Sequence, residues 1–108
     1  MVELLEFQTE DGRSPFGLWF AALDAEAAAK VTVALTRMSL GNFSNVEPVG
    51  SGVSEYKINW GPGYRIYFGK DGDRFVILLV GGTKKRQASD IAKAKGHWAD
   101  YKRRKRSL

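Results

Sequence analysis

The stretch SEYKINWGPGYRIYFGKDGDRFVILLVGG, residues 54–82, decides the fold. Polar and apolar residues alternate along its first half, and glycine-rich segments at 61–63 and 69–73 interrupt it. This pattern is typical of strands joined by tight turns. The apolar run that follows, residues 74–80, is typical of a central strand covered on both faces. The stretch therefore predicts a three-stranded antiparallel meander, and its Gly81-Gly82 exit allows the backbone to lie close to another group.

Alternation also predicts what each face of the meander carries. If residues 61–63 close a tight hairpin, the apolar residues of the first two strands share one face, which we expect to carry the helices. They then pair as Trp60 with Tyr64, Ile58 with Ile66 and Tyr56 with Phe68. The opposite face gathers Lys57, Asn59, Arg65 and Tyr67 into an open basic and aromatic patch.

Helical signals dominate the residues before and after the meander. Ser14-Pro15 supplies an N-cap and a first-turn proline for a helix over 15–23. Asp24 caps a second helix that begins at Ala25 and ends at Gly41-Asn42. A last helix is predicted to begin between residues 83 and 86, with apolar residues at helical spacing as far as Tyr101.

Two short strands complete the predicted sheet. Residues 2–7 suit a first strand, and residues 46–49 suit an edge strand, where Pro48 is tolerated. The predicted class is α+β, a single domain over residues 1–108, with two N-terminal helices packed on a mainly antiparallel sheet of four to five strands and a C-terminal helix.

Composition limits the compartment and the chemistry. With 108 residues, 44% of them hydrophobic, the chain suits one domain with a core, and it has no cysteine. Acids stand near the start, where a signal peptide has bases, and no stretch approaches the roughly 20 apolar residues of a membrane span. We therefore expect a soluble, cytoplasmic protein. No metal-ligand spacing or cofactor motif is present, and we expect the single histidine, His97, to be a surface or packing residue.

Positive charge is concentrated at the C-terminal end. From Lys84 onward the chain has ten Lys and Arg against two Asp, a net charge of +8, whereas residues 1–83 have seven bases against ten acids, a net charge of −3. Such asymmetry indicates a polyanionic partner, nucleic acid or an anionic membrane. For the basic tail, residues 102–108, the alternative is a flexible, solvated end.

The basic and aromatic patch is the strongest candidate site. Lys57, Arg65 and Tyr67 could surround a phosphate and a base together with the cations that follow the last strand, which are Lys84, Lys85 and Arg86. Backbone N–H groups at the start of the last helix would add to an anion site. The alternative that stays open is an outer strand face that is merely solvated.

Several segments, taken in order, resemble a known family. They are SEYKI at 54–58, GPGYRIY at 61–67, LLVGGTK at 78–84 and QASDIAKA at 87–94, with LGNF at 40–43 and VGSGV at 49–53. Together they are similar to the RelE/ParE toxin superfamily, and more narrowly to its phage-derived Gp49-like, HigB-type "addiction module killer" branch. The resemblance covers about residues 14–101.

The resemblance implies a RelE-like fold and the toxin of a type II toxin–antitoxin system. Most characterised relatives with a basic site cleave mRNA on the ribosome without a metal. By resemblance, Arg65 would stabilise the pentavalent phosphorane, Lys57 matches a strand lysine, and Lys84 or Lys85 matches a basic position after the last strand. Glu47 resembles the glutamate that serves as base in one branch. Asn59 stands where some relatives have a second lysine, and no C-terminal catalytic tyrosine or histidine is matched.

The expected RNA contacts are Asn59, Tyr67, Lys85 and Arg86, and the expected partners are the ribosome, mRNA and a cognate antitoxin, in this branch commonly a helix-turn-helix protein. No membrane partner and no cofactor are implied. Two alternatives stay open. One is a ParE-like inhibitor of DNA gyrase, and the other is a non-catalytic nucleic-acid binder that uses the basic tail.

Overall fold

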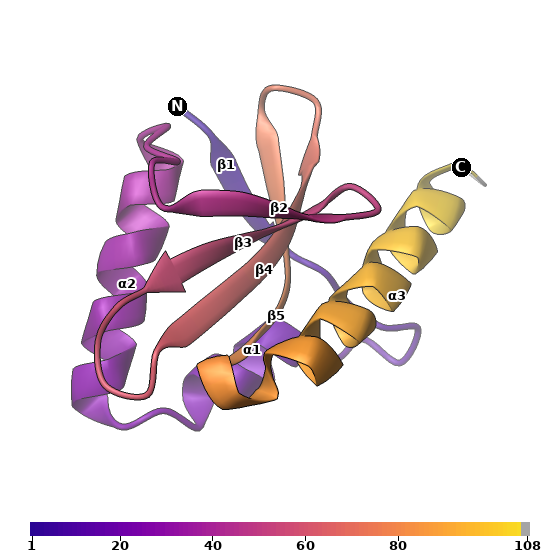
Figure 1. The fold of residues 1–108 in the computed structure, drawn as a ribbon. Helices are drawn as coiled ribbons and strands as arrows, with labels where there is room; N and C mark the ends of the chain where they lie inside the picture. Colours follow the sequence, from indigo (N-terminus) through magenta and orange to yellow (C-terminus); the bar gives the residue numbers. More distant parts are fainter. Residues whose placement is uncertain (107–108) are drawn as a thin grey trace.

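The computed structural model describes residues 1–106, which form a single five-stranded sheet with helices on both of its faces (Figure 1). Along the chain the elements are β1 (Glu3–Glu6), α1 (Pro15–Ala21), α2 (Ala25–Ser39), β2 (Val46–Gly50), β3 (Val53–Ile58), β4 (Tyr64–Asp71), β5 (Phe75–Thr83), the 3₁₀ turn η1 (Lys84–Arg86) and α3 (Gln87–Arg106).

The sheet has the strand order β1-β5-β4-β3-β2. The strands from β2 to β5 form an antiparallel meander, as predicted, and β1 pairs with β5 in the parallel direction, so that the sheet is mixed. The predicted α+β class is confirmed. Residues 102–106 of the basic tail continue α3, and the remainder of that tail, residues 107–108, lies outside the described residues.

Both predicted caps of the N-terminal helices are present. The Gly17 amide donates to Ser14 Oγ at 2.9 Å, and the Ala27 amide donates to Asp24 Oδ1 at 2.8 Å. Each side chain satisfies an amide that has no partner within its own helix. These local bonds explain why α1 and α2 begin where the sequence predicts.

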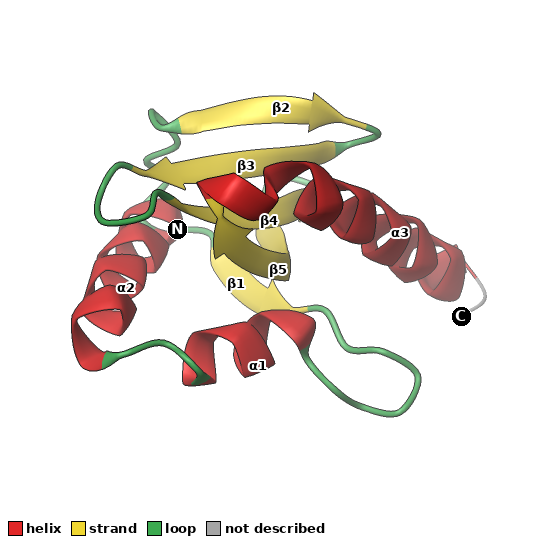
Figure 2. Cartoon of the chain, turned by 60° about the horizontal axis from the view of Figure 1, so that its bottom comes forward, coloured by secondary structure: helices red, strands yellow, loops and turns green. Residues whose placement is uncertain are grey.

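Helices cover both faces of the sheet (Figure 2). Residues of α1 and α2 pack on one face, in a core that includes Phe16, Met38, Tyr56, Ile66 and Phe68. The opposite face packs against α3, in a second core of Phe7, Val53, Tyr67, Ile77, Leu79, Val80, Ala94 and Trp98. Strand β5 is buried between the two layers, as its continuous apolar run predicts.

The predicted register of the first hairpin is wrong by two residues. Ile58 lies opposite Tyr64, and Tyr56 lies opposite Ile66, because residues 59–63 form a five-residue loop rather than a three-residue turn. A shift of two residues leaves every side chain on its predicted face, since strand side chains alternate with period two. Trp60 still contacts Tyr64, with the rings stacked at 6.1 Å.

The prediction of an open second face is also wrong. Tyr67 is fully buried, at 0% exposure, and it belongs to the core beneath α3. The apolar stripe of α3 must be buried, and α1 and α2 already cover the opposite face of the sheet. The helix α3 therefore packs on the face that carries Tyr67. The close approach needs Gly69, because a Cβ atom there would lie 2.5 Å from the Trp98 ring.

A β-bulge between β4 and β5 determines which of the two helical layers each glycine at the end of β5 contacts. Tyr67 lies opposite Val80 and Phe68 opposite Leu78, so that Leu79 is an extra residue. After the bulge, Gly81 lies under the Trp19 ring of α1 and Gly82 lies under the Asp90 carboxylate of α3. The expectation that Gly81-Gly82 allows a close approach is confirmed.

His97 packs in α3, with its ring stacked on Phe7 at 4.9 Å. Burial lowers the pKa of His97, Lys93 lowers it further, and Asp100 opposes them. Because the folded-state pKa lies below the ordinary value of about 6.5, the unfolded chain binds the proton more readily. The free energy of unfolding should therefore decrease as the pH falls from about 6.5 through the folded-state pKa.

The measurement is thermal unfolding at several pH values between about 7.5 and about 5, a range that spans the titration of histidine. We expect His97→Phe, which keeps a ring on Phe7 and removes the titration, to flatten the dependence. An equal slope in the variant would assign the titration to another group.

No helix within the described residues 1–106 is long and apolar enough to cross a membrane.

Candidate functional site

The predicted basic residues meet where β3 ends, β4 begins and α3 starts. Lys57 lies directly opposite Arg65 in the β3–β4 pairing, and Glu55 lies opposite Tyr67. Residues at these positions share the face that α3 covers, although Lys57 lies at its rim. The site is therefore a partly covered polar cluster rather than an open sheet surface.

Glu55 is the centre of this cluster. Its side chain is 2% exposed, and its two carboxylate oxygens accept hydrogen bonds from Gln87 Nε2 at 3.1 and 2.9 Å. Oε1 also lies 3.9 Å from Lys57 Nζ and 4.0 Å from Arg65 Nε. A buried carboxylate needs such partners, because an unpaired charge in the interior is costly. Glu55 thus connects Lys57 and Arg65, two of the three predicted catalytic cations, to the start of α3.

Arg65 lies beneath the rim, with a side chain that is 6% exposed. Its Nη1 donates to the carbonyl oxygens of Gly63 at 3.4 Å and Tyr64 at 3.3 Å. The Gly63 carbonyl also accepts a hydrogen bond from the Lys84 amide at 2.7 Å. One carbonyl therefore joins Arg65 to Lys84. Gly63 itself has a φ of +77°, which favours glycine at this contact.

Lys57 and Glu47 form the accessible part of the site. Lys57 Nζ lies 3.0 Å from Glu47 Oε2, and their side chains are 32% and 65% exposed. Glu47 reaches Lys57 because β2 pairs with β3, with Glu47 opposite Glu55. An ammonium and a carboxylate thus lie side by side in contact with solvent, above the buried Arg65.

Polar atoms without partners gather at the inner side of the cluster. Within residues 1–106, Arg65 Nε, Tyr67 OH and Asp90 Oδ2 are buried without a hydrogen-bond partner. Burial raises the pKa of the Tyr67 hydroxyl, and the carboxylates of Glu55 and Asp90 raise it further. The hydroxyl therefore stays protonated at neutral pH. Because its ring is covered, Tyr67 does not offer the stacking surface predicted for RNA.

The other predicted contact residues are more dispersed. Lys84 and Lys85 are exposed in η1 at the rim of the site. Arg86 lies beside a different hollow, which Asp90 and Trp19 also line. Asn59 is exposed in the β3–β4 loop, in a groove against α2 that Lys57 borders as well. The structure thus brings together Arg65, Lys57, Glu47 and Lys84. Asn59 lies in the neighbouring groove that Lys57 borders, and Arg86 lies beside a separate hollow.

Three residues of the cluster were not predicted as site residues: Glu55, Gln87 and Asp90. A signal for Glu55 exists in the sequence, because alternation places it on the same strand face as Lys57. Gln87 and Asp90 gain their roles from the position of α3 over the sheet, for which the sequence contains no comparable signal.

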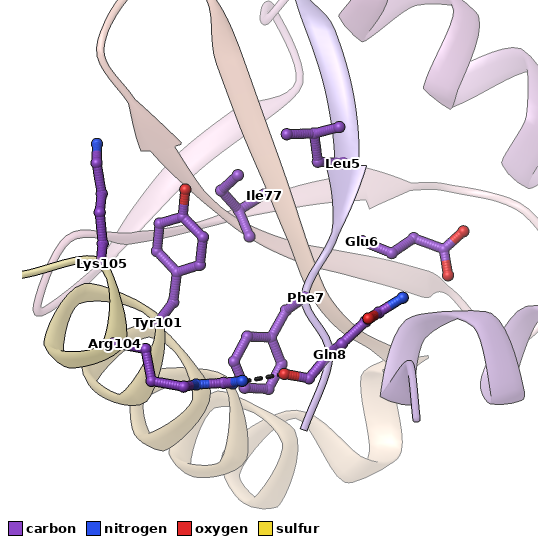
Figure 3. Close-up of a pocket in the computed structure, with 8 residues that line it drawn as sticks. All are labelled: Leu5, Glu6, Phe7, Gln8, Ile77, Tyr101, Arg104 and Lys105. Carbon is purple, nitrogen blue, oxygen red and sulfur yellow. Dashed lines mark hydrogen bonds between the residues drawn. The ribbon is translucent and has the colours of Figure 1, made fainter. Parts of the chain in front are cut away.

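Among residues 1–106 there is no group of three or more His, Cys, Asp or Glu side chains that could hold a metal ion. A hollow of about 480 Å³ lies between β1 and the end of α3 (Figure 3). Its two cations are occupied, since Arg104 donates to the Gln8 carbonyl and Lys105 pairs with Asp71. Leu5, Phe7, Ile77 and Tyr101 give the hollow a mainly apolar lining.

The fold and the site thus define the class of this protein, which is a small α+β domain with a basic rim beside its C-terminal helix. The chain belongs to the family described as "Phage derived protein Gp49-like (DUF891)", which matches residues 18–99. This family is phage-derived and toxin-like, which is compatible with a toxin of a toxin–antitoxin pair.

A relative from Haemophilus influenzae (strain ATCC 51907 / DSM 11121 / KW20 / Rd), named "Uncharacterized protein", is 38% identical over 81 residues. The match covers 74% of this chain and 82% of that protein.

Proposed function

We propose that this chain is the toxin of a type II toxin–antitoxin pair and that it cleaves mRNA on the ribosome, as a HigB-type member of the RelE/ParE superfamily with a RelE-like fold. The observation that carries the proposal is the solvent-accessible pair of Lys57 and Glu47, 3.0 Å apart, above the buried Arg65. The match to a toxin-like family supports the same class of function.

The reaction that suits this site uses the RNA's own 2′-hydroxyl as the nucleophile. The 2′-oxygen attacks the adjacent phosphorus and loses its proton to a base, and the bond from phosphorus to the 5′-oxygen breaks as that oxygen gains a proton from an acid. The products are a 2′,3′-cyclic phosphate and a free 5′-hydroxyl. Negative charge grows on the phosphorane, so cations placed beforehand lower the barrier.

The geometry suggests a role for each residue. Glu47 is an exposed carboxylate, which suits it to accept the proton of the 2′-hydroxyl. Lys57 stands between the carboxylates of Glu47 and Glu55, a place that suits a charged ammonium acting as phosphate ligand or proton donor rather than as base. Arg65 adds a buried positive charge below, and Lys84 adds one at the rim.

The proposed partners follow from this activity. The ribosome presents the mRNA in the cytoplasm, and a cognate antitoxin of the helix-turn-helix type blocks the basic rim. We expect co-expression with the product of the neighbouring gene to give a stable complex and to abolish toxicity. Recovery of the chain without that partner, with toxicity unchanged, would contradict this part.

The decisive experiment incubates the purified chain with mRNA, with and without ribosomes, and maps the new 5′ ends. We expect cleavage only in the presence of ribosomes. Glu47→Gln, which removes the base and keeps the size of the side chain, should lower the rate about 10²-fold or more. Glu10→Gln, at an exposed loop position away from the site, is the matched control and should cleave normally.

A supercoiling assay with purified gyrase separates this function from that of a gyrase inhibitor. Inhibition of gyrase without any cleavage of RNA would overturn the proposal. Unchanged cleavage by Glu47→Gln would overturn the role of Glu47 alone.

A further inference from the structure

A groove of about 260 Å³ lies beside the proposed active site, between α2 and the end of β3. It opens because β2 begins only at Val46, opposite Tyr56, so that the last residues of β3 have no strand on their outer side. The β3–β4 loop, residues 59–63, passes beside the first turns of α2 (Figure 1). The lining residues are Lys30, Val33, Ala34, Arg37, Asn45, Tyr56, Lys57, Ile58, Asn59 and Trp60.

The groove has cations but no acidic lining residue. Lys30 and Arg37 lie seven residues apart on α2, and Lys57 closes the groove on the side of the active site. Within residues 1–106, neither Lys30 nor Arg37 forms an ion pair, unlike Lys57. Two of the three cations are thus available to a bound anion. The amides of Asn45 and Asn59 add exposed donors and acceptors.

Trp60 gives the groove an aromatic surface at its end. One side of the ring stacks on Tyr64 at 6.1 Å, which restrains its orientation. Lys30 Nζ lies 5.6 Å from the ring centroid, so a cation and a flat ring lie together. A base that stacks on such a ring while its phosphate contacts the lysine would use both groups.

We infer that this groove binds single-stranded RNA next to the phosphate that is cleaved, with a base on Trp60 and backbone phosphates at Lys30 and Arg37. This inference rests on the proposed function, because Lys57 belongs both to the groove and to the catalytic site. RNA entering along α2 passes Lys57 and reaches Glu47 without crossing α3.

The lining favours RNA over a protein segment. A helix or strand of a partner protein would bury its apolar face in such a groove, whereas half of the lining residues here are polar or charged. Positive charge, exposed amides and one stacked ring are the combination that single-stranded nucleic acid uses. An acidic protein segment is the competing occupant.

The probe is a fluorescently labelled RNA of twelve nucleotides with 2′-O-methyl groups throughout, which cannot be cleaved, and the readout is its anisotropy with the full chain. We expect the double variant Lys30→Glu/Arg37→Glu to weaken binding about tenfold or more. The slope of log K against log salt should become shallower by about 1.4, at roughly 0.7 per lost phosphate contact. Trp60→Ala should weaken binding roughly fivefold or more, the loss of one stacked base.

The matched control is Arg74→Glu/Lys70→Glu, which makes the same change of charge near the opposite end of β4 and β5. We expect it to bind RNA within about twofold of the parent chain at 0.15 M salt, since distant charges are largely screened there. Melting temperatures check that all variants fold. If the groove variants bind as the control does, the inference is wrong.

The experiments distinguish a failure of the groove inference from a failure of the proposed function. Normal ribosome-dependent cleavage by groove variants that also bind RNA normally would overturn the groove and leave the function intact. Groove variants that bind RNA normally but lose the antitoxin would show that a protein occupies the groove, which also overturns the inference. Loss of RNA binding in the groove variants, with no cleavage by any form of the chain, would support the groove and overturn the function.

Discussion

Arg65→Ala is expected to abolish growth arrest and to lower ribosome-dependent cleavage about 10²-fold or more, the usual effect of removing one donor that stabilises an oxyanion. The guanidinium lies in the interior, where water screens its charge less than at the surface, so its interaction with a nearby phosphate is stronger. It is also joined to Lys84 through the Gly63 carbonyl, so its loss should disturb the rim as well. The measurements are growth after induction and mapping of 5′ ends.

This variant needs a test of folding, because Arg65 compensates the buried Glu55. Removing one partner of a buried ion pair costs about 3–5 kcal/mol. Arg65→Lys keeps a positive charge and should fold better than Arg65→Ala, yet it loses the guanidinium fork and should still cleave poorly. Arg74→Ala, at an exposed arginine near the opposite end of the sheet, should remain fully toxic. A folded Arg65→Ala variant with full toxicity would show that Arg65 is not part of the active site.

Gly81→Ala is expected to cause a large loss of stability, because the added methyl group has no room beside Trp19. A Cβ atom at Gly81 would lie 2.1–2.4 Å from three atoms of the Trp19 ring, and that ring packs against Phe16 and Tyr64. Overpacking of this kind costs about 2–3 kcal/mol. We expect the melting temperature to fall by roughly 10 °C or more, measured by circular dichroism.

Gly96→Ala is the matched control for that substitution. Gly96 lies in α3, and a Cβ atom there would meet nothing within 4 Å. The same added methyl should therefore raise stability by about 0.5–1 kcal/mol through helix propensity. The double variant Gly81→Ala/Trp19→Leu should recover part of the loss, because the smaller side chain makes room. A melting temperature for Gly81→Ala equal to that of the parent chain would mean that Trp19 does not cover β5.

Most of the fold could be predicted because its signals are local. Ser14 and Asp24 cap their helices through hydrogen bonds to amides three residues further along the chain. The continuous apolar run of β5 indicates directly that this strand is buried. Alternation assigned Tyr56, Ile66 and Phe68 to the correct core. The register of the first hairpin failed because glycine residues mark a turn without specifying how many residues it takes.

Less of the candidate site could be predicted. Lys57 and Arg65 were correctly placed on one face by the alternation, but their direct opposition depends on the strand register, which was predicted wrongly. Glu55 was passed over because a charged residue in a strand is normally solvated, and its burial depends on Gln87 arriving from α3. Tyr67 was expected in the open because nothing in β4 indicates which face α3 will cover.

By itself, the sequence determined the order of elements, their caps and the two faces of the meander, because each depends on residues close together in the chain. Only the tertiary structure decided how the meander of residues 54–82 is used. The bulge at Leu79 turns Gly81 toward α1 and Gly82 toward α3, and α3 buries Tyr67 while it leaves Lys57 and Glu47 at the rim. These features depend on how the layers pack, and the packing of one layer on another is a property of the whole chain.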